Sequence, residues 1–533
     1  MSKPLPRPAL PEKTSLFAIA FLEGAMVLSV EILGAKMLAP FFGTSLIVWS
    51  SVIGITLTSL TAGYYFGGYL SKKQNPATIL FTVLLLATFT IVLMPTLAYS
   101  YIGSFSEWSI YTGSFFSALL LLGPPLFLLG TTSPILIQVM TQSVTESGRL
   151  AGTLYAISTV GGILMTFLQG FLLVPLFGIS IPLLFCALIL LITTLGILYT
   201  SRRLIYSLPV FLILLFQFNN LSNWDKPKRS TKVSIPYSSE GLLGQLKVVD
   251  FEDPNSKNPL RHLLINGIGQ TRIINNPTAI SFWKYIHLLS VYSSLQKGKK
   301  EALLFGFGAG SMSNELNRLG MHVDAVEIDE RMMGLAKKYF YFSDTATRFV
   351  VDDARHFIRT EKKKYDLIIF DIANGEVQPS YVYTKECFTE VKNMLNENGL
   401  ILFEFQELMV PDRELVFPSI CKTLKSTGYE PYYHLDSPNG LNDVMILASP
   451  QPIDFANLKK ENMTGCCAMQ PWVPALIEHP FNPWKNELDN ARVFTDNQPM
   501  LDHLHAASLK SWRESMLAYV VRREMIEGYK LFK

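Results

Sequence analysis

The sequence predicts a polytopic α-helical membrane domain followed by an α/β domain with a doubly wound, mainly parallel sheet. Two observations carry this prediction. From Ser15 to about Leu221 the chain is largely apolar and has few charges, whereas from Asn223 onward it has the pattern of a soluble α/β protein. The stretch "LLFGFGAGSMSNELNRLGMHVDAVEID" (303–329) has the order strand, glycine loop, helix, strand and acid that is typical of nucleotide-binding sheets.

The composition limits the classes of protein that need to be considered. The chain has 533 residues, which is too long for one ordinary hydrophobic core, so two or more domains are expected. A mean hydropathy of +0.26 and a charged fraction of 17% both favour a membrane protein. The net charge of +3 gives no electrostatic reason to expect nucleic-acid binding. The 5 cysteines show no zinc-binding spacing, so we expect free thiols and no metal site.

The apolar half contains enough hydrophobic runs for seven membrane spans of about 20 residues each. We therefore expect a seven-helix transmembrane domain at 1–221, a basic linker at 222–232 and a second domain at 233–533. The first run is too long for a cleavable signal peptide, and further spans follow it. The expected spans are 15–39, 46–70, 77–101, 112–140, 150–175, 178–199 and 203–221.

Small and charged residues inside these runs indicate contacts between helices. Gly63 and Gly67 have the small-xxx-small spacing that lets two helix backbones approach closely. Glu23, Glu31 and Lys36 lie in the first span, where a charge is costly and usually faces the bundle interior. For Glu31, a proton or amine site and a buried structural pair both remain open.

The charge distribution bears on membrane topology. With seven spans, eight basic residues before and between the spans fall on one face and place the N-terminus in the cytoplasm. The second domain then lies on the extracytoplasmic side of the plasma (inner) membrane. Four basic residues after the last span favour the opposite side, and one miscounted span would reverse the assignment. The charge count thus favours the extracytoplasmic side only by eight against four.

The second domain is expected to begin with a small β region at 233–275 and to end in a helical tail. The strand at 302–305 leads into the glycine loop, and the next strand ends at Glu327, where an acid can bind a ribose diol. Because carboxyl ends of parallel strands share one sheet edge, the acids there should line one cleft. The later strands end at Asp352–Asp353, at Asp371 and at Gln406.

Several of these segments are similar to a known family. They are "LLINGIGQT" (263–271), the glycine loop, "VEID" (326–329), "DDA" (352–354) and "YDLIIFD" (365–371). Through them residues 233–450 resemble the class I S-adenosylmethionine-type, Rossmann-like fold, and more closely the spermidine synthases, which are polyamine aminopropyltransferases. The apolar half resembles membrane-fused spermidine synthase-like proteins at "VEILGAKMLAPFFGTS" (30–45) and "GRLAGTLYAISTVGG" (148–162).

The resemblance implies an SN2 reaction in which an amine takes the aminopropyl group of decarboxylated S-adenosylmethionine and methylthioadenosine leaves. S-adenosylmethionine itself is the alternative co-substrate, and no metal is implied. By resemblance, Glu327 holds the ribose, Asp353 the adenine edge, and Asp371 accepts the amine proton. The other residues of the implied nucleoside site are Gly306, Gly308, Gly310, Asp329 and Ala354.

The chain departs from the family pattern where amines are bound. Ala309 and Asn374 stand where the family has acids, and "FWK" (282–284) stands in place of Tyr, a polar residue and Glu. Each lost charge-assisted hydrogen bond to a cation is worth about 1.5–3 kcal/mol, so putrescine is not expected to be the acceptor. The implied acceptor pocket contains Phe282, Trp283, Asn374 and, from a late "TDNQP" segment, Asp496.

Two functions remain open on the sequence alone. One is a membrane-bound transferase acting on a sulfonium nucleoside, with an ordinary methyltransferase as a variant. The other is a catalytically lapsed domain that serves as a membrane-anchored binding or assembly protein. A transporter with Glu31 in its pathway is weaker, because the spans show no inverted repeat. The expected partners are the lipid bilayer and a small amine or other nucleophile; protein partners in the membrane and a homodimer stay open.

Overall fold

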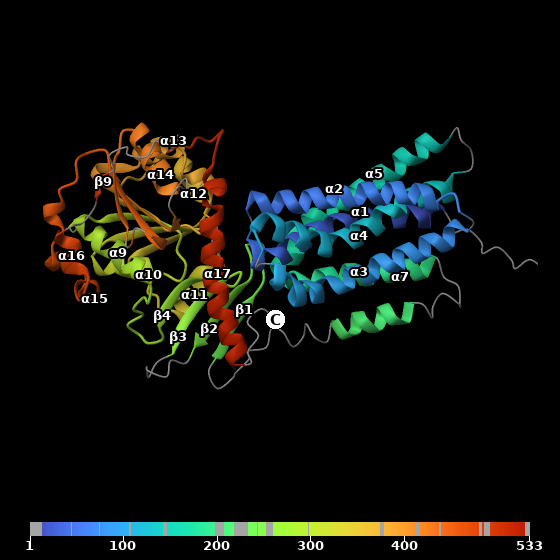
Figure 1. Ribbon diagram of the computed structural model, residues 1–533, viewed down its shortest axis with the longest axis horizontal. Helices are drawn as coiled ribbons and strands as arrows, with labels where there is room; N and C mark the ends of the chain where they lie inside the picture. Colours follow the sequence, from blue (N-terminus) through green and yellow to red (C-terminus); the bar gives the residue numbers. More distant parts are fainter. Residues whose placement is uncertain are drawn as a thin grey trace, which may run out of the picture. The chain divides into compact units, whose positions relative to one another are not determined.

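The computed structural model resolves two compact units, one helical and one α/β (Figure 1). The helical unit contains the described residues up to 217, and the α/β unit contains nearly all of those after 232. The predicted linker at 222–232 lies outside the described residues. The structure describes residues 13–43, 45–73, 75–105, 108–141, 146–197, 207–217, 233–241, 243–251, 259–296, 298–373, 378–410, 415–435, 437, 439–478, 482–483 and 491–527.

The helical unit is built from long apolar helices. In the described part of the chain, 5 of them are long and apolar enough to cross a membrane, and two shorter apolar helices, Ser180–Gly196 and Ser207–Gln217, follow. The count of seven spans therefore stays a prediction. The helices are α1 (Lys13–Phe42), α2 (Leu46–Leu70), α3 (Pro76–Phe105), α4 (Ile110–Met140), α5 (Ser147–Leu168), the π-helical turn η2 (Gln169–Leu173), α6 (Val174–Phe177) and α7 (Ser180–Ile197).

Small residues bring α2 and α4 into close contact. A Cβ atom added to Gly63 would lie 2.3 Å from the main-chain oxygen of Phe127, and one added to Gly67 would lie 2.5 Å from that of Thr131. Only glycine fits at these two positions, as their spacing in the sequence indicated. The α1–α5 contact holds the buried Glu23, whose carboxylate accepts a hydrogen bond of 2.7 Å from the Ser158 hydroxyl.

The α/β unit contains two sheets. The smaller one has the strand order β1-β2-β3-β4, in which β2–β3 and β3–β4 are antiparallel pairs, and the larger one has 8 strands in the order β12-β10-β11-β9-β8-β5-β6-β7. The strands of the smaller sheet are β1 (Val233–Ser239), β2 (Leu246–Phe251), β3 (Leu260–Ile265) and β4 (Ile268–Ile274). Those of the larger sheet are β5 (Glu301–Phe305), β6 (His322–Glu327), β7 (Thr347–Val351), β8 (Tyr365–Phe370), β9 (Leu395–Met409), β10 (Glu430–Leu435), β11 (Gly440–Ser449) and β12 (Asn482–Pro483).

Helices cover both faces of the larger sheet (Figure 1). Successive residues of β5 point to opposite faces, so Ala302 and Leu304 join one buried cluster while Leu303 and Phe305 join the other. The first cluster includes α9 (Lys284–Ser293), α10 (Ser311–Arg318) and α11 (Arg331–Tyr339). The second includes α12 (Ala354–Thr360), α13 (Lys385–Lys392), α14 (Val416–Ser426) and the start of α17 (Leu501–Glu527). The predicted doubly wound architecture is confirmed.

The sheet is mixed rather than parallel throughout. The pairs β5–β6, β6–β7, β5–β8 and β8–β9 are parallel, as the strand and helix alternation predicted. The strands β11, β10 and β12 extend the sheet in antiparallel pairs beyond β9. This extension brings the start of β11 to the same sheet edge as the end of β9, because antiparallel neighbours run in opposite directions.

Candidate active site

The carboxyl ends of β6, β5, β8 and β9 meet at one edge of the larger sheet and form a cleft. Gly306 and Gly308 follow β5, Glu327 ends β6, and Asp371 follows β8. All four residues line this cleft. The glycine loop and the two acids that the sequence singled out are therefore neighbours in the folded chain, because parallel strands place their ends side by side.

The glycine loop depends on backbone conformations that other residues rarely adopt. Gly306 has φ +87°, and a Cβ atom added to it would lie 1.9 Å from the main-chain oxygen of Asp371. Gly310, at φ +84°, is the N-cap of α10 and packs against Phe342 without lining the cleft. The Ala309 side chain belongs to the buried core cluster. The loop thus brings the backbone of Gly306 and Gly308, and no side chain from position 309, to the cleft.

The Glu327 carboxylate is held by backbone amides. Its two oxygens accept hydrogen bonds from the main-chain N–H groups of Phe307 and Asp329, each at 3.0 Å. Burial raises the pKa of Glu327 above its ordinary value, and these two hydrogen bonds partly oppose that shift. A carboxylate oxygen can accept a second hydrogen bond, so Glu327 retains acceptors for a pair of hydroxyl groups in the cleft.

Asp371 lies at the centre of the cleft, between the residues from β6 and those from β9. Burial, and next the negative charge of Glu327, raise the pKa of Asp371 to about 7. A carboxyl group with a pKa near neutrality can accept a proton from a reacting group at physiological pH. The geometry and the protonation state therefore both suit a general base.

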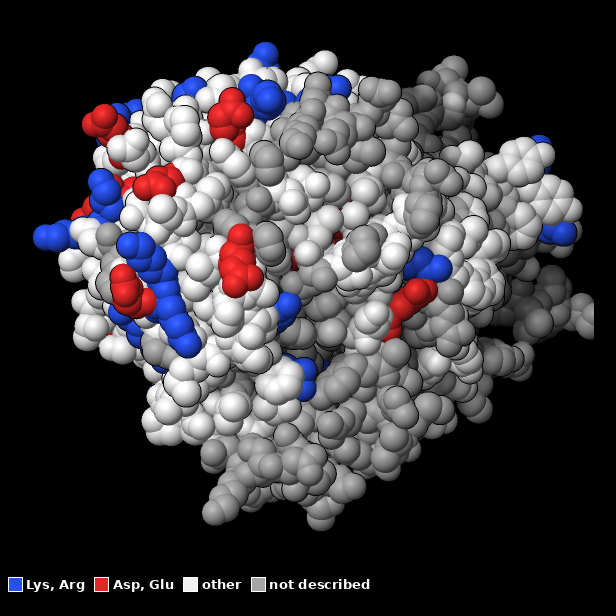
Figure 2. Space-filling model, turned by 60° about the vertical axis from the view of Figure 1, so that its left-hand side comes forward, with Lys and Arg blue, Asp and Glu red and all other residues white. Residues whose placement is uncertain are grey.

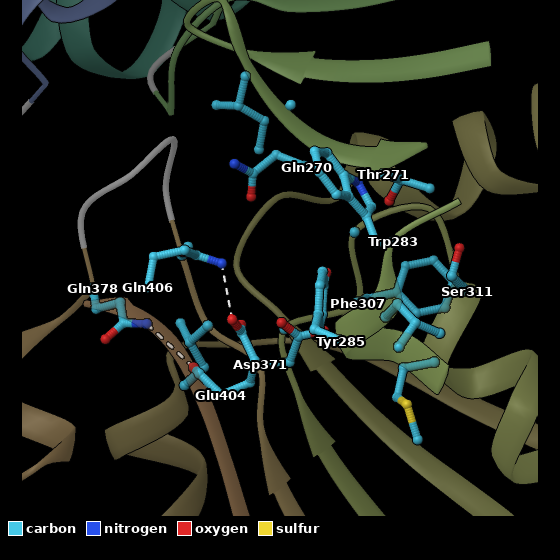
Figure 3. A pocket seen from close by; sticks show the side chains of 18 of the residues that line it. Gln270, Thr271, Trp283, Tyr285, Phe307, Ser311, Asp371, Gln378, Glu404 and Gln406 are labelled. Carbon is cyan, nitrogen blue, oxygen red and sulfur yellow. Dashed lines mark hydrogen bonds between the residues drawn. The ribbon is translucent and has the colours of Figure 1, made fainter. Parts of the chain in front are cut away.

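Other polar residues also line the cleft, among them Tyr285, Glu404 and Asp443, which the sequence analysis did not single out, and Gln406, which ends the predicted strand at 399–406. Gln406 donates a hydrogen bond of 2.8 Å to the Glu404 carboxylate, which Figure 3 shows beside Asp371. Glu404 could have been predicted as a cleft residue, since "EFQ" ends the predicted strand at 399–406. Asp443 gave no such signal, because it lies at the start of an antiparallel strand that the sequence pattern did not reveal.

The ionisable side chains that line the cleft are mainly carboxylic acids. The described lining includes four carboxylic acids, Glu327, Asp371, Glu404 and Asp443, and no Lys, Arg or His. By contrast, basic and acidic side chains are interspersed on the face of the molecule that Figure 2 shows. The cleft therefore suits a ligand that carries positive charge.

Besides Gly310, three further residues of the implied nucleoside site lie outside the cleft lining. Asp329 forms an ion pair of 2.6 Å with Arg331. Asp353 caps α12 by accepting hydrogen bonds from backbone N–H groups, and it also accepts one of 2.7 Å from the Tyr381 hydroxyl. Ala354 is the first residue of α12. The motif acids at these positions hold the strand-to-helix turns together.

Of the residues of the implied acceptor pocket, likewise, only some line the cleft. Trp283 lines the cleft, with its ring centroid 6.0 Å from that of Trp512. Phe282 is 52% exposed and lies under the Arg272 guanidinium. Asp496 lies away from the cleft lining and pairs with Arg355 at 3.0 Å. Asn374 lies outside the described residues.

The chain is similar in sequence to proteins of one known family. A profile of the spermine/spermidine synthase domain matches residues 287–449. The polyamine aminopropyltransferase 2 of Aquifex aeolicus is 24% identical over 472 residues, which are 85% of this chain and 91% of that protein. The polyamine aminopropyltransferase of Saccharolobus solfataricus is 34% identical over 228 residues, which are 39% of this chain and 73% of that protein.

Among solved structures, a probable spermidine synthase from Corynebacterium glutamicum is similar over 51% of this chain and 96% of its own length, with 14% identity and a TM-score of 0.38. The Aquifex similarity is longer than the whole α/β unit, so it extends into the helical unit. On the profile match and the Saccharolobus relative, this chain belongs to the spermidine synthase (polyamine aminopropyltransferase) family.

Proposed function

We propose that the protein is a membrane-bound aminopropyltransferase that moves the aminopropyl group of decarboxylated S-adenosylmethionine to an amine. The observation that carries this proposal is the cleft with four carboxylic acids and no basic residue in its described lining. Both substrates are cations, which such a cleft attracts. S-adenosylmethionine has an additional carboxylate that the same acids repel, so methyl transfer is the less favourable use of the site.

Glu327 and the glycine loop would hold the nucleoside. The Glu327 carboxylate is fixed by two backbone amides and accepts hydrogen bonds from the two ribose hydroxyls. Gly306 and Gly308 line the cleft without side chains, so a nucleoside can lie directly against the backbone there. The same arrangement holds the leaving group, methylthioadenosine.

Asp371 would accept the proton of the attacking amine. The nitrogen lone pair forms a bond to the carbon beside the sulfonium, and the electrons of the breaking C–S bond go to sulfur. The proton that the new ammonium centre loses goes to the Asp371 carboxylate. A pKa of about 7 in the unliganded cleft leaves this carboxyl group ready to take up a proton near neutral pH.

We propose that the acceptor is an amine other than putrescine. Ala309 places no acid in the cleft, and position 284 is Lys where the family pattern has Glu. Trp283 and Trp512 instead give the cleft an apolar wall. Such a wall favours an amine with a longer hydrocarbon chain, because each buried methylene contributes about 0.8 kcal/mol.

The helical unit would anchor the enzyme in the plasma (inner) membrane, with residues 1–221 as the transmembrane domain. The long apolar helices support this placement. The charge count favours an extracytoplasmic α/β domain, whereas the supply of a cytosolic co-substrate favours the cytoplasm. A topology reporter fused after Lys533 decides between them, since it is active on only one side.

The test of the proposed function is release of methylthioadenosine by the detergent-purified full-length protein, given decarboxylated S-adenosylmethionine and a panel of amines. We expect amine-dependent release, with a lower rate on putrescine than on a longer polyamine. Asp371→Asn should lower the rate about 10²–10⁴-fold, the usual contribution of a general base. The control is Asp344→Asn, which changes a surface acid paired with Lys337 and should leave the rate unchanged.

Two outcomes would contradict parts of this proposal. Release that is fastest with putrescine would contradict the proposed acceptor. No release with any amine, together with retained binding of methylthioadenosine, would favour the catalytically lapsed binding or assembly protein instead.

A further inference from the structure

Trp283 and Tyr285 reach the cleft from the turn between β4 and α9. Trp283 is the N-cap of α9, Tyr285 lies in its first turn, and both line the cleft, as Figure 3 shows. The residue between β4 and Trp283, Phe282, is tied to β4 by a hydrogen bond of 2.8 Å from its N–H group to the main-chain oxygen of Arg272. This wall of the cleft therefore depends on how the short turn at 281–283 is held.

Ser281 closes this turn with two different atoms. Its hydroxyl oxygen accepts a hydrogen bond of 3.1 Å from the Trp283 N–H group. Its main-chain oxygen lies 2.9 Å from Nε2 of His287 in α9, and the His287 side chain is buried. Because a carbonyl oxygen can only accept a hydrogen bond, Nε2 of His287 must carry a proton and donate to it.

The other ring nitrogen of His287 has a partner of its own. With the proton on Nε2, Nδ1 of the neutral ring is an acceptor, and it lies 3.4 Å from the Cys467 sulfur. Cys467 is fully buried and belongs to the short helix α15 (Gly465–Ala468). A thiol that donates to Nδ1 keeps the imidazole in one tautomer and one orientation.

The helix α15 is itself fixed to the body of the α/β unit. Its N-cap residue Thr464 donates a hydrogen bond of 3.0 Å to the carboxylate of Glu315, a buried residue of α10 that also pairs with Arg318. The Cys467 sulfur lies 3.5 Å from the same carboxylate. The helix α15 is thus held by α10 and presents Cys467 to His287, and neither of these two residues lines the cleft.

We propose that His287 is a positioning residue for the reaction: held by Cys467, it fixes the turn at 281–283 and so sets Trp283 against the acceptor amine. The inference rests on the proposed function, in which Trp283 and Trp512 form the apolar wall beside the acceptor. The nucleoside site lies elsewhere in the cleft, because the glycine loop and Glu327 are at the ends of β5 and β6. Loss of the His287 contacts should therefore weaken binding of the acceptor and spare binding of the nucleoside.

Steady-state kinetics on the detergent-purified full-length protein test this role. Methylthioadenosine release is followed at saturating decarboxylated S-adenosylmethionine, with the best amine of the panel as the varied substrate. His287→Leu removes both hydrogen bonds, whereas His287→Gln keeps an N–H donor for the Ser281 carbonyl oxygen. Cys467→Ala removes the donor to Nδ1, and Cys467→Ser retains one. Cys421→Ala is the control, because Cys421 is an equally buried cysteine in the core cluster on the opposite face of the sheet.

We expect His287→Leu to raise the acceptor KM about tenfold, the effect of losing a buried hydrogen bond, with little change in kcat or in the Kd for methylthioadenosine. Cys467→Ala should raise the acceptor KM in the same direction, while His287→Gln and Cys467→Ser recover most of the acceptor affinity and Cys421→Ala matches the native protein. A native-like acceptor KM in His287→Leu, or equal losses in His287→Leu and His287→Gln, would overturn the proposal.

A second measurement needs no turnover. Protein labelled with fluorotryptophan gives fluorine NMR signals for its 7 tryptophans, and Trp283→Phe identifies the signal of Trp283. We expect His287→Leu to shift this signal, and His287→Gln and Cys421→Ala to leave it in place. An unchanged Trp283 signal in His287→Leu would overturn the proposal. A shifted signal in a protein that releases no methylthioadenosine with any amine would keep the control of Trp283 by His287 and reject the proposed function.

Discussion

Glu327→Gln is the substitution that tests the nucleoside site most sharply. The native carboxylate accepts two backbone hydrogen bonds of 3.0 Å and has two further acceptor positions for a ribose diol. Glutamine has nearly the same shape but no charge, and its NH₂ group must face one of the two backbone donors. The loss of charge-assisted hydrogen bonds should cost about 1.5–3 kcal/mol of binding free energy. That range corresponds to a Kd increase of roughly 10–150-fold.

The assay is isothermal titration of methylthioadenosine into the detergent-solubilised protein. Glu330→Gln is the matched control, because this exposed glutamate is on the same segment but does not line the cleft. Thermal melting of each variant reports whether its fold is retained. A Glu327→Gln protein that melts like the native one and binds methylthioadenosine within about threefold of it would refute this assignment.

Three other predictions follow from the geometry. Because Asp371 must be ionised to accept a proton and its pKa is raised to about 7, kcat/KM should fall more steeply with decreasing pH below that value than above it, where only deprotonation of the acceptor amine still raises it; a profile without a change of slope near pH 7 would contradict its role as base. Gly306→Ala should abolish methylthioadenosine binding, since its Cβ would lie 1.9 Å from a main-chain oxygen. The control is Gly334→Ala, which should bind methylthioadenosine normally because a Cβ there meets no atom within 4 Å; equal binding by both variants would show that the loop is more pliable than its geometry implies. Gly67→Leu should lower the melting temperature in detergent because it separates α2 from α4, while Gly68→Leu, whose Cβ would enter open space, should not; identical melting curves would show that this helix contact is unimportant for stability.

Strand and helix periodicity was sufficient to predict the architecture. The alternation of short apolar runs with amphipathic segments predicted β5 to β9 and their parallel order, because burial on both faces of a sheet leaves that pattern in the sequence. The glycines at 306 and 308 and the acids at 327 and 371 were predicted to share a cleft for the same reason. These residues could be predicted because each one ends or closely follows a strand, and strand ends can be recognised in a single sequence.

The remaining cleft residues depend on contacts between distant segments. Asp443 enters the cleft only because β11 pairs with β9 in antiparallel register, and nothing local to "GLNDVMILAS" reveals that pairing. Conversely, Asp353 and Asp329 matched sequence motifs, yet their side chains bond to neighbouring backbone or to Arg331. The loss of acids at 309 and 284 suggested a weak amine site, but Glu404 and Asp443 supply carboxyl groups from other strands.

The helical unit shows a different limit of prediction from sequence. Hydropathy identified the long helices, because a helix needs about 20 apolar residues to cross a bilayer. It does not determine whether Ser180–Gly196 and Ser207–Gln217 also span, since both are shorter than that. The side of the membrane on which the α/β domain lies depends on this count, and it therefore stays a prediction.

The most direct test of aminopropyl transfer is to follow an isotopic label. The purified full-length protein is incubated with decarboxylated S-adenosylmethionine labelled in the aminopropyl group and with a polyamine acceptor, and products are identified by mass spectrometry. We expect the label to appear on the acceptor in an amount equal to the methylthioadenosine released, and to appear about 10²–10⁴-fold more slowly with Asp371→Asn. Methylthioadenosine without labelled acceptor, or equal labelling by the Asp371→Asn protein, would contradict the proposed chemistry.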